Sequence, residues 1–224
     1  MVTTLAAVAF IALTVSLGRW QVGRGEEKAA RQSMFDSRLR DAPLRLTGSV
    51  PTADPLLYRR VAARGEWIPE RQIYVDNQIR DGRAGFHVVT PLKIEASPAA
   101  VLVNRGWIAR DARYPEAPPV AVPRGPVEVH GLATRPPARF LELSPQVISG
   151  NVWQNLSIER YRERSGLELL PVVVLADPPA EGLAAVRETP DAGIAKHREY
   201  ALTWFSLAIT ALVLWIVLNL RRQP

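Results

Sequence analysis

Cysteine is missing from the 224-residue sequence, which excludes disulfide bonds, thiolate catalysis and the cysteine-ligated copper or iron–sulfur centres of electron carriers. Histidine is scarce: the chain has His87, His130 and His197, and no two of them have the spacing of a metal site. We expect His87 and His130, each alone in a predicted strand, to be surface or satisfied core residues. Any metal chemistry must therefore use a single histidine or carboxylates.

Catalytic signatures are absent as well. The sequence has no Gly-x-Ser-x-Gly, His-Glu-x-x-His, phosphate-loop or dinucleotide-binding motif, which favours a protein that is not an enzyme. The net charge of +6 comes from arginines scattered along the chain, with no block of like charge that would indicate a tail for nucleic acid. We expect no nucleic-acid partner and interpret the basic residues as a solvated surface that faces a membrane.

Long apolar runs occur at the two ends of the chain. Residues 201–220 contain no charged side chain and match the ~20 residues that cross a hydrocarbon core of ~30 Å. Trp204 and Trp215 lie near the ends of this run, where aromatic side chains favour the headgroup zone, and Arg221 and Arg222 follow it. This pattern predicts a transmembrane helix.

Residues 2–17 form a second, shorter apolar run, which needs Trp20 and the snorkelling side chains of Arg19 and Arg24 to complete a span. The alternative is a cleaved signal peptide. Against it, no basic region precedes the run and no small-x-small cleavage site follows it. We therefore expect this segment to be retained as a transmembrane helix, which makes the lipid bilayer one partner of the protein.

Between the two runs the chain is long enough for one domain of ordinary size. A stalk is expected after the first run, because good helix formers continue without a proline before Pro43. Lysine and arginine counts do not decide the orientation, because long domains translocate largely regardless of flanking charge. The predicted parts are a transmembrane helix (1–23), a helical stalk (24–43), a β-rich domain (44–196), a second transmembrane helix (197–220) and a tail (221–224).

The middle of the chain consists of short runs rich in valine, isoleucine and aromatic residues, which are typical of strands. Asp81-Gly82 separates two of these runs and is a favoured hairpin turn, so we expect an antiparallel sheet there. Residues 157–165 are compatible with a short helix. The predicted strands are 58–67, 72–79, 85–93, 100–108, 127–133 and 172–175. The predicted fold is an α+β membrane protein whose two terminal transmembrane helices flank one β-rich domain, an antiparallel sheet or barrel-like structure with short helices.

A candidate cofactor-binding face begins one turn before the second predicted span, where His197, Tyr200 and Trp204 share one side of a helix. An imidazole, a phenol and an indole in this arrangement suit the edge of haem, because imidazole is a common axial ligand and aromatic walls bury the macrocycle. The alternative is an ordinary aromatic belt with a histidine at headgroup level, which the spacing alone favours.

On the other predicted helix, Trp20, Arg24 and Lys28 repeat at intervals of four residues and share one face. The two cations suit propionates or lipid phosphates, although interfacial anchoring by snorkelling explains them nearly as well. Gly18 and Ala201 are small residues near the ends of the two spans and would allow the helices to approach closely.

Several motifs occur in a fixed order along the chain. They are Gly18-x-Trp20-Gln21-x-x-Arg24-x-x-x-Lys28, Val75-Asp76-Asn77, Gly85-Phe86-His87-Val88-Val89-Thr90-Pro91-Leu92, Val101-Leu102-Val103-Asn104-Arg105-Gly106-Trp107-Ile108 and His197-x-x-Tyr200-Ala201-x-x-Trp204-Phe205. Their combination, order and spacing resemble the Surfeit locus protein 1 family, and the resemblance covers almost the whole chain.

The resemblance implies an assembly factor for haem-copper cytochrome c oxidase that assists the delivery of haem a to the catalytic subunit. It implies His197 as the residue associated with haem iron, the catalytic subunit as partner and haem a synthase as a further candidate partner. It also implies that the middle domain lies outside the inner membrane. No mitochondrial presequence precedes the first span, so we expect a bacterial inner membrane, with cytoplasmic termini and a periplasmic middle domain.

On this basis we expect the two spans to form a transient cradle, in which His197 ligates or guides haem a while Arg24 and Lys28 neutralise its propionates. Five motif residues in predicted strands are candidates for a face that docks on the oxidase subunit, with turn satisfaction and sheet packing as the alternative role: Asp76, Asn77, Asn104, Arg105 and Trp107.

Two other functions remain open at this point. The first is a cofactor-free membrane scaffold that binds oxidase subunits and never contacts haem. The second, a periplasmic sensor domain anchored at both ends, is disfavoured because only three residues follow Arg221.

Overall fold

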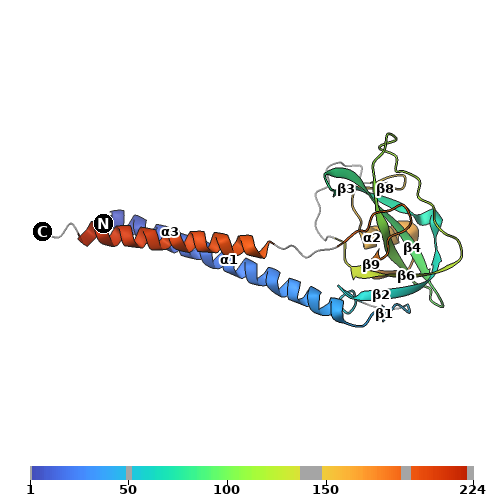
Figure 1. Ribbon diagram of the computed structural model, residues 1–224, viewed down its shortest axis with the longest axis horizontal. Helices are drawn as coiled ribbons and strands as arrows, with labels where there is room; N and C mark the ends of the chain where they lie inside the picture. The colour runs from blue at the N-terminus through green and yellow to red at the C-terminus, as the bar shows by residue number, and fades with distance from the viewer. Residues whose placement is uncertain (1, 49–51, 137–147, 188–192, 221–224) are drawn as a thin grey trace. The chain divides into compact units, whose positions relative to one another are not determined.

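The computed structural model describes residues 2–48, 52–136, 148–187 and 193–220 (Figure 1). The chain divides into two compact units, one of Met1–Ser37 with Thr189–Pro224 and one of Arg38–Glu188. Two terminal candidate membrane helices thus flank a β-rich middle domain with a short helix, and the predicted α+β fold is confirmed. Arg221 and Arg222, with the predicted tail, lie outside the described residues.

The terminal unit is a pair of helices, α1 (Val2–Arg40) and α3 (Ile194–Leu220), which run side by side (Figure 1). Each is long and apolar enough to cross a membrane. The helix α1 continues without a break from the predicted span through the residues predicted as a stalk. Proline is absent from α1, so nothing interrupts its backbone hydrogen bonds.

Small residues line the contact between the two helices. A Cβ atom placed on Gly18 would lie 2.7 Å from the ring of Phe205, so a larger residue at this position would displace that ring. On α3, Ala201 and Ala208 are buried, and Thr14 of α1 is buried with its hydroxyl donating to the backbone oxygen of Phe10. The helices therefore approach closely where Gly18 leaves space for the Phe205 ring.

The middle domain is built on a closed ring of five strands. In ring order they are β2 (Arg60–Trp67), β6 (Pro126–Thr134), β9 (Leu169–Ala176), β5 (Ala100–Ala109) and β4 (Arg83–Ile94). The C-terminal end of β4 pairs back with β2 and closes the ring, which removes the free edges of these strands. The barrel-like alternative of the sequence prediction is therefore the form that the structure adopts.

The remaining strands extend the sheet beyond the ring. The strand β3 (Ile73–Arg80) pairs with the N-terminal half of β4 through the turn at Asp81 and Gly82, as predicted. Three two-residue strands were too short to be predicted: β1 (Leu44–Arg45), β7 (Ile148–Ser149) and β8 (Val152–Trp153). A single turn of 3₁₀ helix, η1 (Pro69–Arg71), precedes β3.

Two predicted strand boundaries were wrong for identifiable reasons. The strand β2 begins at Arg60 rather than Tyr58, because Tyr58 adopts a left-handed backbone conformation with a φ of 61°. The strand β9 begins at Leu169 rather than Val172. Pro171 lies within it, where the parallel pairing with β5 is irregular, so the missing N–H of proline is tolerated.

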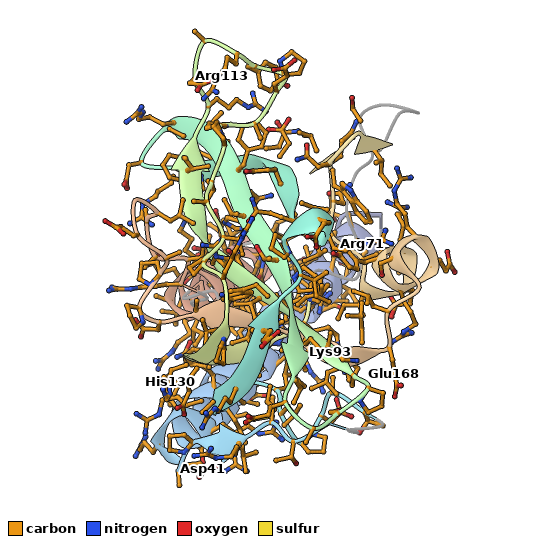
Figure 2. The ribbon with its side chains drawn as sticks, turned by 90° about the vertical axis from the view of Figure 1, so that its right-hand side faces the viewer. Asp41, Arg71, Lys93, Arg113, His130 and Glu168 are labelled. Carbon is orange, nitrogen blue, oxygen red and sulfur yellow. The ribbon has the colours of Figure 1, made fainter. Side chains whose placement is uncertain are left out.

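Three apolar clusters fill the domain. The largest fills the ring, where Val61, Leu92, Val103 and Val174 are essentially inaccessible to water. The second lies outside the ring under the helix α2 (Ile158–Ser165), and the third, around Phe86, lies on the opposite face of β3 and β4. Figure 2 shows the side chains of this domain, with Arg113 on a loop at one end and Asp41 at the other.

The pairing of β2 with β4 that closes the ring leads to a prediction about stability. A Cβ atom on Gly65 would lie 1.9 Å from the backbone oxygen of Lys93 on β4, so Gly65→Ala must separate the two strands. We expect a loss of about 2–4 kcal/mol in the free energy of unfolding, measured by denaturant titration of the detergent-solubilised protein with tryptophan fluorescence. The neighbouring Arg64→Ala removes only an exposed ion pair with Glu95 and should change stability by less than about 1 kcal/mol. Equal stability of the two variants would contradict this account of closure.

Candidate functional site

The predicted haem-associated histidine lies one turn into α3 and contacts α1. The Nδ1 atom of His197 is 2.6 Å from Oε1 of Gln21, which makes the hydrogen bond an attachment between the two helices. One turn further along α1, Gly25 faces the same histidine, since a Cβ atom there would lie in ordinary contact with Cβ of His197, 3.6 Å away.

This hydrogen bond selects one tautomer of the neutral imidazole ring. The amide oxygen of Gln21 can only accept, so Nδ1 of His197 donates in this arrangement. In that tautomer the lone pair is on Nε2. A metal-binding histidine is commonly held in this way, with one ring nitrogen bonded to a protein acceptor and the other directed at the metal.

Gln21 was missed as a functional residue by the sequence reasoning, although it stands inside the motif that begins at Gly18. A glutamine near the surface of a predicted span has no chemistry of its own that would single it out. Only its position in the sequence could have indicated its role. Gln21 follows Trp20 directly and precedes Gly25 by four residues, on the helix that packs against His197.

The other predicted cofactor residues remain accessible. Trp20 and Tyr200 are each more than half exposed, and Trp204 is half-buried. The guanidinium of Arg24 lies 6.0 Å from the Trp20 ring and 2.8 Å from Glu27, an exposed ion pair of little strength. Lys28 follows one turn further along α1. His197 contacts α1 through Gln21, which is not among the three residues predicted on that helix.

A groove of about 440 Å³ runs beside this contact, between α1 and α3. Gln21 and Gly25 line it, whereas His197 does not, so the groove lies next to the imidazole on the neighbouring face of the helix pair. Apart from Gln21, Glu26 and Arg198, its walls are aliphatic and aromatic: Val22, Gly25, Ala29, Ile194, Ala201, Leu202 and Phe205.

In the middle domain, the predicted docking residues fall into two separate groups. The first centres on Asp76, which is buried and accepts hydrogen bonds from Nε and Nη2 of Arg110 at 3.0 and 2.6 Å. The same guanidinium donates to Oδ1 of Asn77 and lies 4.0 Å from the ring centre of Tyr114. Asn77 sits at a bulge in β3 with a φ of 58° and is exposed.

The second group centres on Arg105, which is 4% exposed. It donates to Oε1 of Gln72 and to the backbone oxygen of Ala121, and its guanidinium lies 5.3 Å from the ring centre of Trp67. The hydroxyl of Thr90 donates to the same Gln72 oxygen. Burial lowers the pKa of the Arg105 guanidinium from its usual value, which matches its place in a polar network that attaches the proline-rich segment to the sheet.

Asn104 and Trp107 shape the backbone between these groups. Oδ1 of Asn104 accepts from the backbone N–H of Gly106, whose φ of 143° accompanies a break in the register with β4. The indole N–H of Trp107 donates to the backbone oxygen of Gln78, and Trp107 also pairs with Ala184. Asn104 is buried and Trp107 is half-buried, so Asn77 is the most accessible of the five predicted docking residues.

The remaining histidines lie apart from His197 in the chain. His130 is exposed on β6, with Nε2 3.8 Å from a Glu128 oxygen. His87 is half-buried on β4, and burial lowers the pKa of its imidazole from 6.5 to about 4. Within the described part of the chain, no three His, Asp or Glu residues gather as a metal site.

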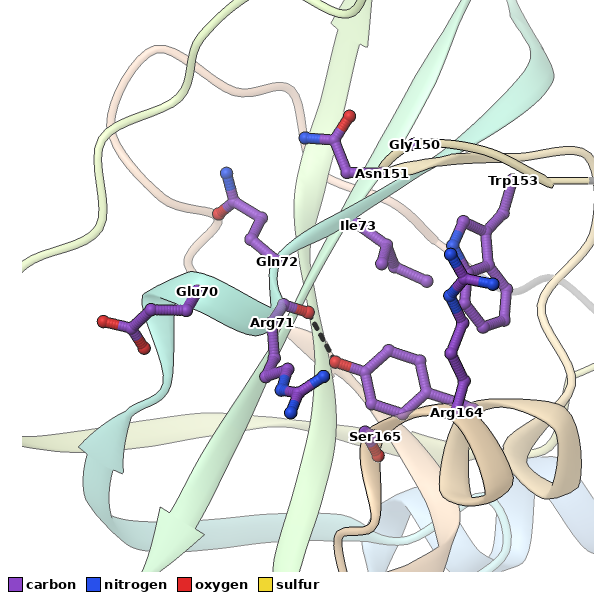
Figure 3. Close-up of a pocket in the computed structure, with 10 residues that line it drawn as sticks. Glu70, Arg71, Gln72, Ile73, Gly150, Asn151, Trp153, Arg164 and Ser165 are labelled. Atoms are coloured by element: carbon purple, nitrogen blue, oxygen red, sulfur yellow. Dashed lines mark hydrogen bonds between the residues drawn. The ribbon is translucent and has the colours of Figure 1, made fainter.

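A small cavity of about 110 Å³ lies beside α2 and is shown in Figure 3. The hydroxyl of Tyr161 donates to the backbone oxygen of Arg71, and burial raises the pKa of this phenol. The Tyr161 ring also packs on Trp153 with their centres 5.5 Å apart. The cavity is too small for a cofactor and is a packing gap between α2 and β3.

Comparison with known proteins gives one family. The model of the SURF1 family matches residues 8–209, which is most of the chain. A SURF1-like protein of Rickettsia felis is 26% identical over 97% of this chain and 96% of its own length. One from Rickettsia conorii is 28% identical over 95% and 90%, and Surfeit locus protein 1 of Mus musculus is 26% identical over 95% and 74%.

The burial of His87 predicts a dependence of stability on pH. Its pKa of about 4 in the fold is below the ordinary value of 6.5, so between these values the unfolded chain binds a proton that the folded chain does not. Stability is complete above pH 6.5 and falls by roughly 3 kcal/mol as the pH drops toward 4.

Denaturant unfolding at pH 7.0, 5.5 and 4.5 measures this effect. The variant His87→Gln should lose the dependence, because carboxylate contributions are common to both proteins and cancel in the difference. The variant His130→Gln, which alters an exposed histidine, should keep it. Parallel pH profiles of His87→Gln and the unaltered protein would disprove the burial argument.

Proposed function

The chain belongs to the SURF1 family, whose members are cytochrome oxidase assembly factors, and on that premise we propose that it assists the delivery of haem a to the catalytic subunit of a haem-copper oxidase. The protein acts as a chaperone and catalyses no reaction. Among its partners are the oxidase subunit, the bilayer and, at the point of supply, haem a synthase.

The observation that carries this proposal is the hydrogen bond between His197 and Gln21. Because Nδ1 is engaged, Nε2 is the ring atom left to bind a metal, and the bond holds the ring against α1. Haem would supply an iron that accepts a nitrogen ligand, and Nε2 of His197 would be the atom that holds it. A single protein ligand suits a carrier that must release its cargo.

The accessible aromatic residues extend this site along both helices. Trp20 and Tyr200 expose more than half of their surfaces, and each would gain from burial against a flat apolar ring. Trp204 follows Tyr200 by one turn and continues the same face of α3.

Cations at the same level suit the acidic edge of such a ligand. Arg24 engages Glu27 in an exposed pair that costs little to exchange for a propionate, and Lys28 follows on the same face of α1. We place the site at the membrane surface of a bacterial inner membrane, with the middle domain in the periplasm and the termini in the cytoplasm.

The middle domain provides the surface for the oxidase subunit in this proposal. On β3, Asn77 and Ile79 are exposed and lie two residues apart, so they share one face of the strand, and Ile79 is 77% exposed. Arg110 and the exposed Tyr114 lie beside Asn77, and such aromatic and arginine side chains are enriched at interfaces. Buried Asp76, Asn104 and Arg105 act on this face by holding its bulges and loops in place.

The haem step is tested by absorption spectra of the purified full chain after co-expression with haem a synthesis. Haem a should copurify with the unaltered protein and be lost from His197→Ala. The variant Gln21→Leu should bind haem roughly 10-fold more weakly, because it removes the group that orients the imidazole. The exposed neighbour Lys196→Ala serves as the control and should bind normally. Absence of haem from every sample would favour the cofactor-free scaffold instead.

The docking step is tested by replacing Ile79 with serine. Since this side chain is exposed, Ile79→Ser should leave the stability and abundance of the protein unchanged and lower the content of assembled oxidase several-fold. The control is Arg60→Ser, an exposed residue on β2. Oxidase levels equal to those of the control would remove β3 from the docking surface.

A further inference from the structure

The middle domain contains a cavity of about 390 Å³ that the proposed function does not use. It lies on the outer face of the sheet, beside the apolar cluster under α2, and its lining residues all belong to the middle domain. Its volume is within the range of small-molecule sites.

The floor of the cavity is a continuous surface across four strands. Val75 of β3 pairs with His87 of β4. Two residues further along β4, Val89 pairs with Asn104 of β5. Asn104 in turn pairs with Leu175 of β9. Because paired residues project from the same face of a sheet, these side chains form one layer.

The walls combine aliphatic side chains with cations. Aliphatic groups come from Val75, Val89, Leu156, Val173, Leu175 and Val186. Charged side chains come from Arg135 and Arg187, and no carboxylate is present among the lining residues. The lining is therefore apolar with a positive charge balance, which suits an anion that carries an apolar body.

Arg135 is able to serve such an anion. Its present partner is Asp54, with Nη2 and Oδ1 3.1 Å apart, and both side chains are at least half exposed. An exposed pair of this kind contributes little to stability, so a carboxylate inside the cavity can replace Asp54 at small cost.

The second cation of the lining is Arg187, whose side chain is exposed. Asn155 also lines the cavity, but its amide nitrogen is inaccessible to water and, within the described residues, makes no hydrogen bond. A ligand in the cavity therefore does not reach this donor. His87 adds a neutral imidazole to the same lining.

We propose that this cavity binds a small aliphatic carboxylate, with its aliphatic chain lying on the four-strand floor and its carboxylate paired with Arg135 and Arg187. The site is separate from the helix pair and does not depend on haem delivery, so either proposal can fail without the other.

The test uses the full chain in nanodiscs, which avoids detergent that would compete for the cavity. Octanoate is titrated by calorimetry and by the shift of the thermal unfolding midpoint, with octanamide as the uncharged analogue. We expect saturable octanoate binding, at least 5-fold tighter than octanamide binding. The variant Arg135→Gln should weaken octanoate binding at least 5-fold, whereas Arg64→Gln, on β2 outside the cavity, should not.

The variant Arg187→Gln separates a binding role from a structural one. Because the Arg187 side chain is exposed, the change should leave the unfolding midpoint of the ligand-free protein unaltered while it weakens octanoate binding. Absence of saturable binding, equal binding of octanoate and octanamide, or normal binding by Arg135→Gln would each overturn the proposal.

Discussion

The approach of β2 to β4 at Gly65 is the constraint on which the rest of the middle domain depends. A side chain at this residue would meet the backbone of Lys93, so the ring closes only because glycine leaves the space. Once β2 occupies the C-terminal end of β4, β3 must pair with the other half of that strand. Closure therefore creates the outer sheet of β3, β4 and β5, which carries the candidate docking residues and the cavity of about 390 Å³.

Polar groups buried in that outer sheet determine which of its residues a partner can reach. Arg105 and Thr90 both donate hydrogen bonds to Gln72 beneath the proline-rich segment. Arg110 donates to Asp76 and Asn77. A buried network is specific when all of its members are paired and costly when one is lost. In the docking proposed above, these residues fix the shape of the surface, and the exposed side chains beside them make the contacts.

The sequence predicted the strands, the central hairpin and both terminal helices, because alternating or continuous apolar runs report burial directly. It predicted a barrel-like structure only as one of two alternatives, since Gly65 inside a strand indicates a close backbone approach without naming the partner. Gln72 and Arg105 are 33 residues apart and follow no periodicity, so their contact left no local signal. The five predicted docking residues share motifs but not one network, because a motif records neighbours in the chain and the bulges redirect their side chains.

The link between Gln21 and His197 joins residues 176 positions apart, and the whole β-rich domain lies between them in the chain. A ribosome therefore translates that domain after Gln21 and before His197. A product truncated before α3 retains the β-rich domain and lacks the oriented imidazole. Under the proposed function, such a product keeps the docking surface without the haem ligand, so it competes with the intact protein instead of being merely inactive.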